Sequence, residues 1–289
     1  MTARTRKSVR FGPYTVGEGH PVRVVAEIGV NHLGCLDRAK ELVLAAHEAG
    51  ADAIKLQTYI SEERYDRDNN PKADKFIRML TDWELDREQE TELWEYAKGL
   101  GAVVFTSPFD AASADFAAEM GSVAFKLAAF EIVNLDLVRA VAKHGKPVVF
   151  SRGMASLEEI AKCVEILEDH GCECIILHCI SSYPTPMPDS NIRMIHTLRE
   201  HFDWPIGHSD HTRGANVPPL AVAAGAVMIE KHFTTNPKRR ESDHPFAITP
   251  YELREIIFRV RQVETLLGRG DISKIDAESY MWDFRRKSA

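Results

Sequence analysis

The sequence lacks any apolar stretch that approaches the roughly 18 residues of a membrane-spanning helix. Its first residues, MTARTRKSVRFG, also lack the apolar core of a secretory signal. These two absences argue against a membrane partner and against export. We therefore expect a cytoplasmic protein.

Positive charge and cysteine are also scarce. Lysine and arginine number 36 against 43 aspartates and glutamates, so the formal net charge is -7 and no basic face suited to nucleic acid is expected. Basic residues cluster only at 238–240 and at the two termini. The cysteines lack the paired spacing of a zinc site, and we expect them to be reduced thiols, mostly buried: Cys35, Cys163, Cys172, Cys174 and Cys179.

Apolar runs of strand length alternate with amphipathic stretches of helix length along most of the chain. This alternation predicts parallel strands joined by helices. The expected strands read VRVVAEIGV, ADAIKLQTY, AVVFTSPF, VAFKLAA, KPVVFSRG, CIILHC, WPIGHSDH and AVMIEKHF. The expected helices cover residues 36–49, 86–100, 111–120, 134–144, 156–169, 191–201, 215–224 and 250–267.

Eight such repeats predict an α/β fold, a closed (β/α)8 TIM barrel over residues 22–268. An open doubly wound sheet is the alternative, but no glycine-rich dinucleotide fingerprint follows the first strand. We expect residues 1–21 to form a β-hairpin that caps the bottom of the barrel, and residues 269–289 to form a tail. The polar stretch 60–85 is too long for a simple connection, so a lid or substrate loop is expected there.

The expected strands begin apolar and end polar. In a barrel of this kind, residues at the carboxyl ends of the strands face the active site. Here they are Glu27, Asn31, His32, Lys55, Gln57, Thr106, Ser107, Lys126, Ser151, Arg152, His178, Ser181, Ser209, Asp210, His211, Lys231 and His232. This concentration of polar groups predicts the location of the site.

Lys55 and Lys126 stand at similar places on the second and fourth expected strands. A buried lysine is unfavourable unless it is paired or bound to a ligand, so the two lysines predict an anionic ligand. The hydroxyls of Thr106, Ser151 and Ser209 share the same opening and suit a phosphate group. The alternative is structural, with each lysine paired to a neighbouring carboxylate inside the barrel mouth.

His211 and His232 would lie at matching heights on neighbouring strands, where two imidazoles can share one cation. With no thiolate and many oxygen donors nearby, the pattern favours Mn²⁺ over structural zinc, with Mg²⁺ and Co²⁺ as further candidates. Such an ion would act as a Lewis acid. The alternative is a pair of satisfied core histidines that merely finish two strands.

Nine segments follow one another in the order AEIGVNHLG, IKLQTY, FTSPFD, FKLAAFEI, SRGMAS, HCISSYPTP, GHSDHTRG, EKHFT and SDHPFAITPYEL. Together they resemble the sialic acid synthase family, from about residue 9 to about residue 268. The resemblance implies a (β/α)8 catalytic barrel that condenses phosphoenolpyruvate with an open-chain N-acyl amino sugar aldehyde, releasing phosphate and a 2-keto sugar acid. It also implies that a metal ion held by His211 and His232 polarises the aldehyde.

The resemblance assigns roles to single residues as well. Those implied to hold phosphoenolpyruvate are Lys55, Thr106, Lys126, Ser151 and Ser209, with Ser181 where the family often has an amide or hydroxyl. Those implied to face the sugar or the attacking water are Glu27, Gln57, Glu131, Tyr183 and Asp243. Catalytic roles are expected for Glu27, Lys55, Tyr183 and Asp243. For Glu131 and Asp243, a structural salt bridge remains an equal alternative.

The chain departs from the family pattern at KLAAFE. Ala129 removes a hydroxyl from the expected phosphate site, and Phe130 places an aromatic ring where the family keeps glycine. Arg152 replaces a small hydroxyl residue, and we expect it to supply the phosphate contact that Ala129 cannot make.

Family members usually continue into a small antifreeze-like domain, which lends an arginine to the sugar site of the partner subunit. The sequence after the expected barrel is too short for that domain. We expect Arg239 or Arg240, just before Asp243, to take over the role of the missing arginine. A homodimer is expected only if the barrel surface or the tail supplies another interface.

Three functions are compatible with the sequence. The leading one is a metal-dependent condensation of phosphoenolpyruvate with a sugar aldehyde, which gives a 3-deoxy-2-keto sugar acid of the sialic acid type. The second is the same chemistry on a non-sialic acceptor in a specialised pathway. The third is a non-catalytic barrel that acts as a binding subunit; the presence of Lys126, His211 and His232 argues against it.

Overall fold

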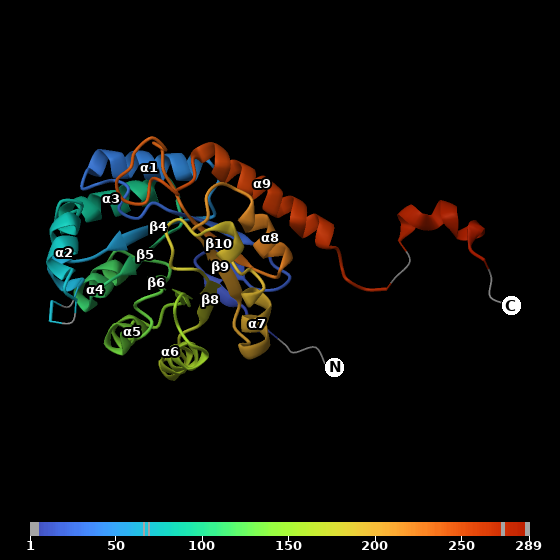
Figure 1. Cartoon of the computed structure of the whole chain (residues 1–289), viewed down its shortest axis with the longest axis horizontal. Coiled ribbons are helices and arrows are strands. Elements are labelled where there is room, and N and C mark those ends of the chain that lie inside the picture. The colour runs from blue at the N-terminus through green and yellow to red at the C-terminus, as the bar shows by residue number, and fades with distance from the viewer. Residues whose placement is uncertain (1–5, 66, 69, 273–274, 287–289) are drawn as a thin grey trace.

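Eight parallel strands close into a barrel, which confirms the predicted (β/α)8 fold (Figure 1). The computed structural model describes residues 6–65, 67–68, 70–272 and 275–286. Around the barrel the strands follow the order β10, β3, β4, β5, β6, β7, β8 and β9. Their bounds are β3 (Arg23–Glu27), β4 (Ala53–Thr58), β5 (Val104–Pro108), β6 (Phe125–Leu127), β7 (Val148–Ser151), β8 (Cys174–His178), β9 (Ile206–Asp210) and β10 (Met228–His232).

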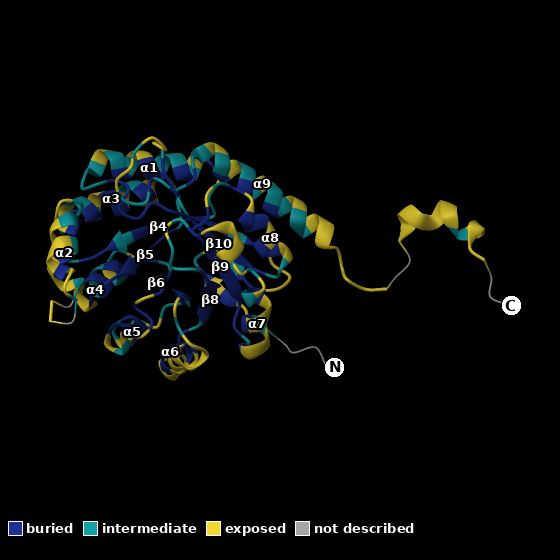
Figure 2. Ribbon diagram, viewed as in Figure 1, coloured by how far each residue is buried: buried dark blue, intermediate teal, exposed yellow. Residues whose placement is uncertain are grey.

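Almost every residue of these strands is buried, because one face of each strand fills the barrel and the other packs against helices (Figure 2). The surrounding helices are α1 (Leu36–Glu48), α3 (Arg87–Gly99), α4 (Ala111–Glu119), α5 (Leu135–Ala142), α6 (Leu157–Asp169), α7 (Met194–His201), α8 (Val217–Ala223) and α9 (Pro250–Leu267). They lie close to the ranges expected from the sequence.

Side-chain caps fix the starts of several helices. Ser156 accepts a hydrogen bond from the backbone N–H of Glu159 before α6, and the Glu159 carboxylate accepts one from the N–H of Ser156. Thr249 and Glu252 make the same reciprocal pair before α9, where proline is the first helical residue. These capping boxes satisfy backbone groups that the first helical turn leaves free.

A hairpin of β1 (Val9–Phe11) and β2 (Tyr14–Val16) packs at the amino end of the barrel, as the sequence predicts. The ring of Phe11 meets Phe105 of β5 edge to face, with centroids 5.1 Å apart. Gly12 packs against Val103 and Val123, which precede β5 and β6. The hairpin therefore covers the end of the barrel opposite the polar strand ends.

The long insertion between β4 and α3 contains ordered structure that the sequence interpretation did not specify. It holds the short 3-10 helix η1 (Ser61–Glu63) and the helix α2 (Ala73–Thr81). Leu80 of α2 joins Val30, Tyr59 and Phe109 in a small buried cluster of its own. The insertion is therefore packed over loops at the carboxyl ends of β3, β4 and β5.

Beyond α9 the described chain runs away from the barrel and includes the 3-10 helix η3 (Asp276–Phe284), whose side chains are mostly exposed (Figures 1 and 2). Another 3-10 helix, η2 (Met187–Asp189), lies between β8 and α7. Among the described helices, none is both long and apolar enough to cross a membrane.

Candidate active site

Inward-facing side chains from strands that are not neighbours meet at the carboxyl end of the barrel. Lys55 Nζ on β4 lies 3.8 Å from Glu230 Oε2 on β10, and Lys126 Nζ on β6 lies 3.5 Å from Glu230 Oε1. Neither β4 nor β6 pairs with β10 in the barrel. These contacts therefore cross the interior, and all three side chains lie inside the mouth.

Lys55 is enclosed by polar partners. Its Nζ lies 2.8 Å from Glu27 Oε2 and donates a hydrogen bond to Ser107 Oγ at 3.1 Å. Burial lowers the pKa of Lys55, but the carboxylates of Glu230 and Glu27 outweigh burial and raise the pKa above its ordinary value. The lysine is therefore charged, and the carboxylate pairing of the structural alternative is present around it.

Glu230 is a site residue that the sequence interpretation missed. It is buried, and it accepts a hydrogen bond from Ser209 Oγ at 2.9 Å. Burial raises the pKa of Glu230, but Lys126 and Lys55 lower it to about 2, so the carboxylate is ionised. The strand period of two could have found it, because residues 230 and 232 share one face of β10.

Lys126 is less completely paired than Lys55. Glu230 is the one carboxylate within ion-pair distance of it in the described part of the chain. Burial lowers the pKa of Lys126 even though Glu230 acts in the opposite direction. The buried hydroxyl oxygens of Ser151 and Ser181 have no hydrogen-bond partner among the described residues. A partly paired cation near unpartnered hydroxyls suits an anionic ligand.

Glycine at position 153 keeps this wall of the site open. A Cβ atom there would stand 2.5 Å from Ser181 Oγ, 2.7 Å from Cys179 Sγ and 3.1 Å from Ala129 Cβ. The Cys179 thiol is buried, and its pKa is raised by that burial while the Lys126 charge opposes the shift. Cys179 thus lies between Lys126 on one side and the wall formed by Gly153 and Ser181 on the other.

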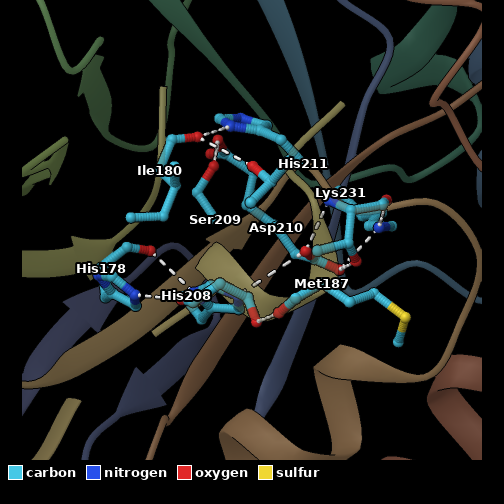
Figure 3. Close-up of polar contacts among 12 residues, drawn as sticks. His178, Ile180, Met187, His208, Ser209, Asp210, His211 and Lys231 are labelled. Carbon is cyan, nitrogen blue, oxygen red and sulfur yellow. Dashed lines mark hydrogen bonds and ion pairs between the residues drawn. The ribbon is translucent and has the colours of Figure 1, made fainter. Parts of the chain in front are cut away.

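His211 and His232 lie side by side, with ring centroids 5.5 Å apart. His211 Nδ1 lies 2.7 Å from the carbonyl oxygen of Ile180, so this nitrogen carries a proton and donates it (Figure 3). Burial lowers the pKa of His211 to about 3, which keeps the ring neutral.

His232 is held by a carboxylate instead of a carbonyl group. Its Nδ1 lies 3.2 Å from Asp243 Oδ2, a charge contact without the alignment of a hydrogen bond. Burial lowers the pKa of His232, but Asp243 outweighs burial and raises it. Asn31 fixes the carboxylate in turn, because its Oδ1 accepts a hydrogen bond from the backbone N–H of Asp243 at 3.1 Å.

The two imidazoles fit a divalent metal ion. Each ring engages its protein partner through Nδ1, which leaves Nε2 as the nitrogen for a metal. Within residues 6–65, 67–68, 70–272 and 275–286, no group of three or more histidine, cysteine, aspartate or glutamate side chains is arranged to hold an ion. The protein would supply two nitrogens and leave the other positions to water or substrate, which suits an exchangeable ion better than structural zinc.

Tyr183 forms an outer wall beside the histidines. Its ring centroid is 4.3 Å from that of His211, 6.3 Å from that of His232 and 5.4 Å from that of Phe246. The residue is 49% exposed, so part of it is accessible to a ligand.

Three polar side chains converge around Gly29. Gln57 Nε2 donates a hydrogen bond to Glu27 Oε1 at 2.8 Å. Gly29 has a φ of +50°, and a Cβ atom on it would stand 3.1 Å from Gln57 Nε2, 3.1 Å from Glu27 Oε1 and 3.3 Å from Asp243 Oδ2. The predicted partners of the sugar or the water, Glu27, Gln57 and Asp243, are therefore brought together, with glycine leaving them room.

Glu131 lies on the loop after β6 and is buried. Its Oε2 accepts a hydrogen bond from Asn134 Nδ2 at 3.2 Å, and burial raises its pKa. Next to it, Phe130 is 41% exposed and stacks on Phe109 with centroids 6.1 Å apart. The guanidinium of Arg64 lies 3.5 Å from the centroid of the same Phe109 ring. Arg64 was not predicted as a site residue, because it lies in an insertion without regular periodicity.

Several strand-end residues that were expected at the mouth point outward instead. Thr106 pairs in register with Leu56, the neighbour of the inward Lys55, and its Oγ1 lies 2.9 Å from Thr58 Oγ1. The reason is that side chains alternate between the two faces of a strand. The expected phosphate contact by Thr106 is therefore corrected, and Ser107 takes the inward position.

The same alternation places His178, His208, Asp210 and Lys231 on the outer side of the strands. Lys231 Nζ lies 2.7 Å from Asp210 Oδ2, and the rings of His178 and His208 stack with centroids 5.2 Å apart. These buried side chains join β8, β9 and β10 and thereby support the strands that carry Ser209, His211, Glu230 and His232.

Arg152 belongs to this outer group. Its Nε and Nη2 lie 3.4 Å and 3.3 Å from His178 Nδ1, and burial lowers the pKa of that histidine to about 4. The neutral imidazole thus accepts from the guanidinium. The expectation that Arg152 supplies a phosphate contact is corrected, because its guanidinium faces His178 behind the barrel wall.

Arg239 and Arg240 line a hollow of the β10–α9 loop together with Asn236, Lys238 and Glu241. Burial raises the pKa of Asp243, farther along the same loop, but His232 above all, together with His211 and Arg64, lowers it below its ordinary value. The expected role of Arg239 or Arg240 in the sugar site stays a prediction.

Known proteins share this fold and sequence. A model of the NeuB family matches residues 42–272. An uncharacterised protein of Methanocaldococcus jannaschii is 41% identical over 266 residues, which cover 92% of this chain and 77% of that protein. An N,N'-diacetyllegionaminic acid synthase of Legionella pneumophila is 36% identical over 269 residues, which cover 88% of this chain and 76% of that enzyme. The crystal structure of an N-acetylneuraminic acid (sialic acid) synthetase from Leptospira borgpetersenii superposes with a TM-score of 0.91 at 33% identity, covering 98% of both chains.

Proposed function

The chain belongs to the NeuB family, and from this membership and the geometry of the barrel mouth we propose a metal-dependent synthase that joins phosphoenolpyruvate to an open-chain sugar aldehyde. The product is a 3-deoxy-2-keto sugar acid of the sialic acid type. The observation that carries the proposal is a pair of buried lysines, Lys55 and Lys126, in one mouth with the imidazole pair and the unpartnered hydroxyls of Ser151 and Ser181.

The reaction joins two carbon atoms and releases phosphate. The methylene carbon of phosphoenolpyruvate bonds to the aldehyde carbon, and the aldehyde oxygen takes a proton and becomes a hydroxyl group. Water adds to the central carbon of the former enol. The bond between that carbon and the bridging oxygen then breaks, phosphate leaves, and the new hydroxyl loses its proton to give the keto group.

Phosphoenolpyruvate lies between the two lysines. Lys55 and Lys126 face its anionic groups, and Ser151 and Ser181 donate hydrogen bonds to its oxygens, whereas the Ser209 hydroxyl donates to Glu230 and lies beside the phosphate. Ser107 holds the ammonium group of Lys55, and Glu230 orients Ser209 and Lys126. Lys126 makes most of the new contacts with the anion, because the described residues offer its ammonium group a single carboxylate partner, at 3.5 Å.

The charges of the site support a requirement for a further cation. Glu27 and Glu230 already offset the charges of Lys55 and Lys126. A multiply charged phosphate ester added to that balanced group is unfavourable in a buried site. When bound to His211 and His232, a divalent ion, Mn²⁺ or alternatively Mg²⁺ or Co²⁺, supplies two positive charges and a Lewis acid for the aldehyde oxygen.

Glu27 serves as the base for the attacking water. Its carboxylate is held by Lys55 on one oxygen and by Gln57 on the other, so its orientation is fixed before the substrate enters. Asp243 orients His232 through Nδ1. Tyr183 covers the histidines and limits the access of water to the aldehyde.

The proposal is tested by incubating the purified protein with phosphoenolpyruvate, Mn²⁺ and a panel of amino and neutral aldoses. Consumption of phosphoenolpyruvate with one acceptor, and its loss on adding a chelator, is the expected result. The variant Lys126→Met should lose this turnover, whereas Lys143→Met, an exposed lysine paired with Asp115, should keep it. Turnover that persists in Lys126→Met would contradict the assignment of the phosphoenolpyruvate site.

A further inference from the structure

Arg64 is a largely enclosed cation with few partners. It directly follows η1 in the insertion after β4. Both of its Nη atoms lie 3.4 Å from Gln57 Oε1, its one hydrogen-bond acceptor among the described residues. Its Nε is buried and has no partner in the described part of the chain. A guanidinium in this state is unfavourable unless a ligand completes its hydrogen bonds.

Aromatic rings hold the guanidinium in place. Its central carbon lies 3.5 Å from the ring centroid of Phe109 and 4.8 Å from that of Tyr59. Cation–π contacts stabilise the charge without using the N–H donors. The donors of Arg64 are therefore available in a fixed plane, as bidentate recognition of an anion requires.

Gln57 connects Arg64 to the reaction centre. Its Oε1 accepts from Arg64, and its Nε2 donates to Glu27 Oε1 at 2.8 Å. Glu27 Oε2 then contacts Lys55 Nζ. These contacts form one line from the inner lysine to the insertion, and Arg64 stands at its outer end.

The two carboxylates whose charges act on Arg64 contact other groups. Glu131 accepts a hydrogen bond from Asn134, and Asp243 faces His232. Both act on the charge of Arg64 through space. Neither forms an ion pair with it in the described structure, so the positive charge is free to meet an anion from outside the chain.

We propose that Arg64 binds an anionic group of the acceptor sugar, a phosphate or a carboxylate, at the end of the open chain opposite the aldehyde. This inference rests on the proposed function, which sets the aldehyde at the histidine pair, and it adds that the rest of the sugar extends past Gln57. The acceptor is then a sugar phosphate or a sugar acid. Arg64, and not Arg239 or Arg240, is the arginine that selects it.

The test compares N-acetylmannosamine with its 6-phosphate and with the corresponding uronic acid, in wild type and Arg64→Met. Phosphoenolpyruvate consumption gives kcat and KM, and calorimetric titration of each sugar into the protein with Mn²⁺ and without phosphoenolpyruvate gives its affinity. The wild type should favour one anionic sugar over the neutral one by about tenfold or more in kcat/KM, as for hydrogen bonds to a charged group. Arg64→Met should lose that preference mainly through KM, because the contact is equal in the ground and transition states. Arg64→Lys should keep part of it.

Arg67→Met is the matched control, since Arg67 is an exposed arginine of the same insertion that pairs with Glu62 and Asp74. Equal affinity of the wild type for the three sugars, or an anion preference that survives in Arg64→Met, would overturn the inference. A wild type that binds neither anionic sugar while binding phosphoenolpyruvate would also overturn it and would leave the proposed function standing. Failure to bind phosphoenolpyruvate would refute the proposed function itself. The unfolding midpoint of each variant and its affinity for phosphoenolpyruvate show whether a loss is confined to the acceptor.

Discussion

Replacement of Lys231 by methionine tests the position of the polar group behind the barrel wall. Lys231 Nζ lies 2.7 Å from Asp210 Oδ2, and both side chains are only 1% exposed. In the variant, the Asp210 carboxylate keeps hydrogen bonds from Thr212 N at 2.9 Å and Thr212 Oγ1 at 3.0 Å. It loses its charged partner, Lys231. His208, 3.8 Å away, does not replace that charge, because burial lowers the pKa of the imidazole and keeps the ring neutral.

Removing one member of a buried ion pair typically costs about 3 to 5 kcal/mol, since the other charge remains buried. The two hydrogen bonds that Asp210 keeps favour the lower end, so we expect Lys231→Met to lose about 3 kcal/mol of unfolding free energy. That is a large share of the roughly 5 to 15 kcal/mol by which a protein is stable. The double variant Lys231→Met/Asp210→Asn should regain part of the loss, because it has no uncompensated charge.

The assay is guanidinium unfolding of the wild type, Lys231→Met and the double variant, followed by far-ultraviolet circular dichroism, with phosphoenolpyruvate affinity measured in parallel. Affinity should not change, because Lys231 faces away from the mouth. A single variant with wild-type stability would refute the energetic reasoning. A large loss of affinity in a stable Lys231→Met protein would refute the outward placement.

Three other changes give separable outcomes. Burial raises the pKa of Glu90 from 4.5 to about 7 although Arg87 opposes the shift, so the folded state holds a proton that the unfolded state has released. The unfolding free energy of the wild type should therefore fall relative to that of Glu90→Gln as pH rises from about 4.5 to about 7, by up to about 3 kcal/mol. Urea unfolding measures both proteins, and a stability difference between them that does not change with pH would contradict this. Ser107→Ala should raise the KM for phosphoenolpyruvate and Thr106→Val should not, because Ser107 and not Thr106 contacts Lys55; the reverse order in steady-state kinetics would restore the original expectation. His211→Ala should abolish Mn²⁺ binding measured by calorimetry at a pH where the wild type binds, and unchanged affinity would exclude this residue as a ligand.

The barrel could be predicted from the sequence because each of its parts has a local signal. Apolar runs at regular intervals indicate strands, and cap residues such as Ser156 and Thr249 indicate where helices begin. The polar ends of the strands then predict which end of the barrel carries the site. Lys55, Lys126, His211 and His232 were brought together on this reasoning alone.

The direction in which each side chain points was predicted less well. A residue near a strand end was taken to face the site, although successive side chains of a strand point to opposite faces. Thr106, Asp210 and Lys231 are adjacent in sequence to inward residues and for that reason face outward. Glu230 was overlooked although it has the same parity as His232. The register of the strands shows which residues face inward. Register depends on how each strand pairs with its neighbours, and a single segment of sequence does not show that pairing.

Arg64 could not have been predicted from its own segment. The insertion has no strand period, and the position of the guanidinium depends on Phe109 and Gln57, which are distant in sequence or on another element. Only the folded chain shows that its Nε–H group lacks a partner among the described residues.

Oxygen labelling tests directly whether the protein condenses phosphoenolpyruvate with a sugar by breaking the bond between carbon and the bridging oxygen. The substrate is phosphoenolpyruvate labelled with ¹⁸O at that bridging position. The protein, Mn²⁺ and the acceptor are incubated together, and phosphate and organic product are analysed by mass spectrometry. We expect the label to leave with phosphate and the mass of the product to exceed that of the acceptor by one pyruvate unit. Label retained in the organic product, or consumption of phosphoenolpyruvate without that product, would contradict it.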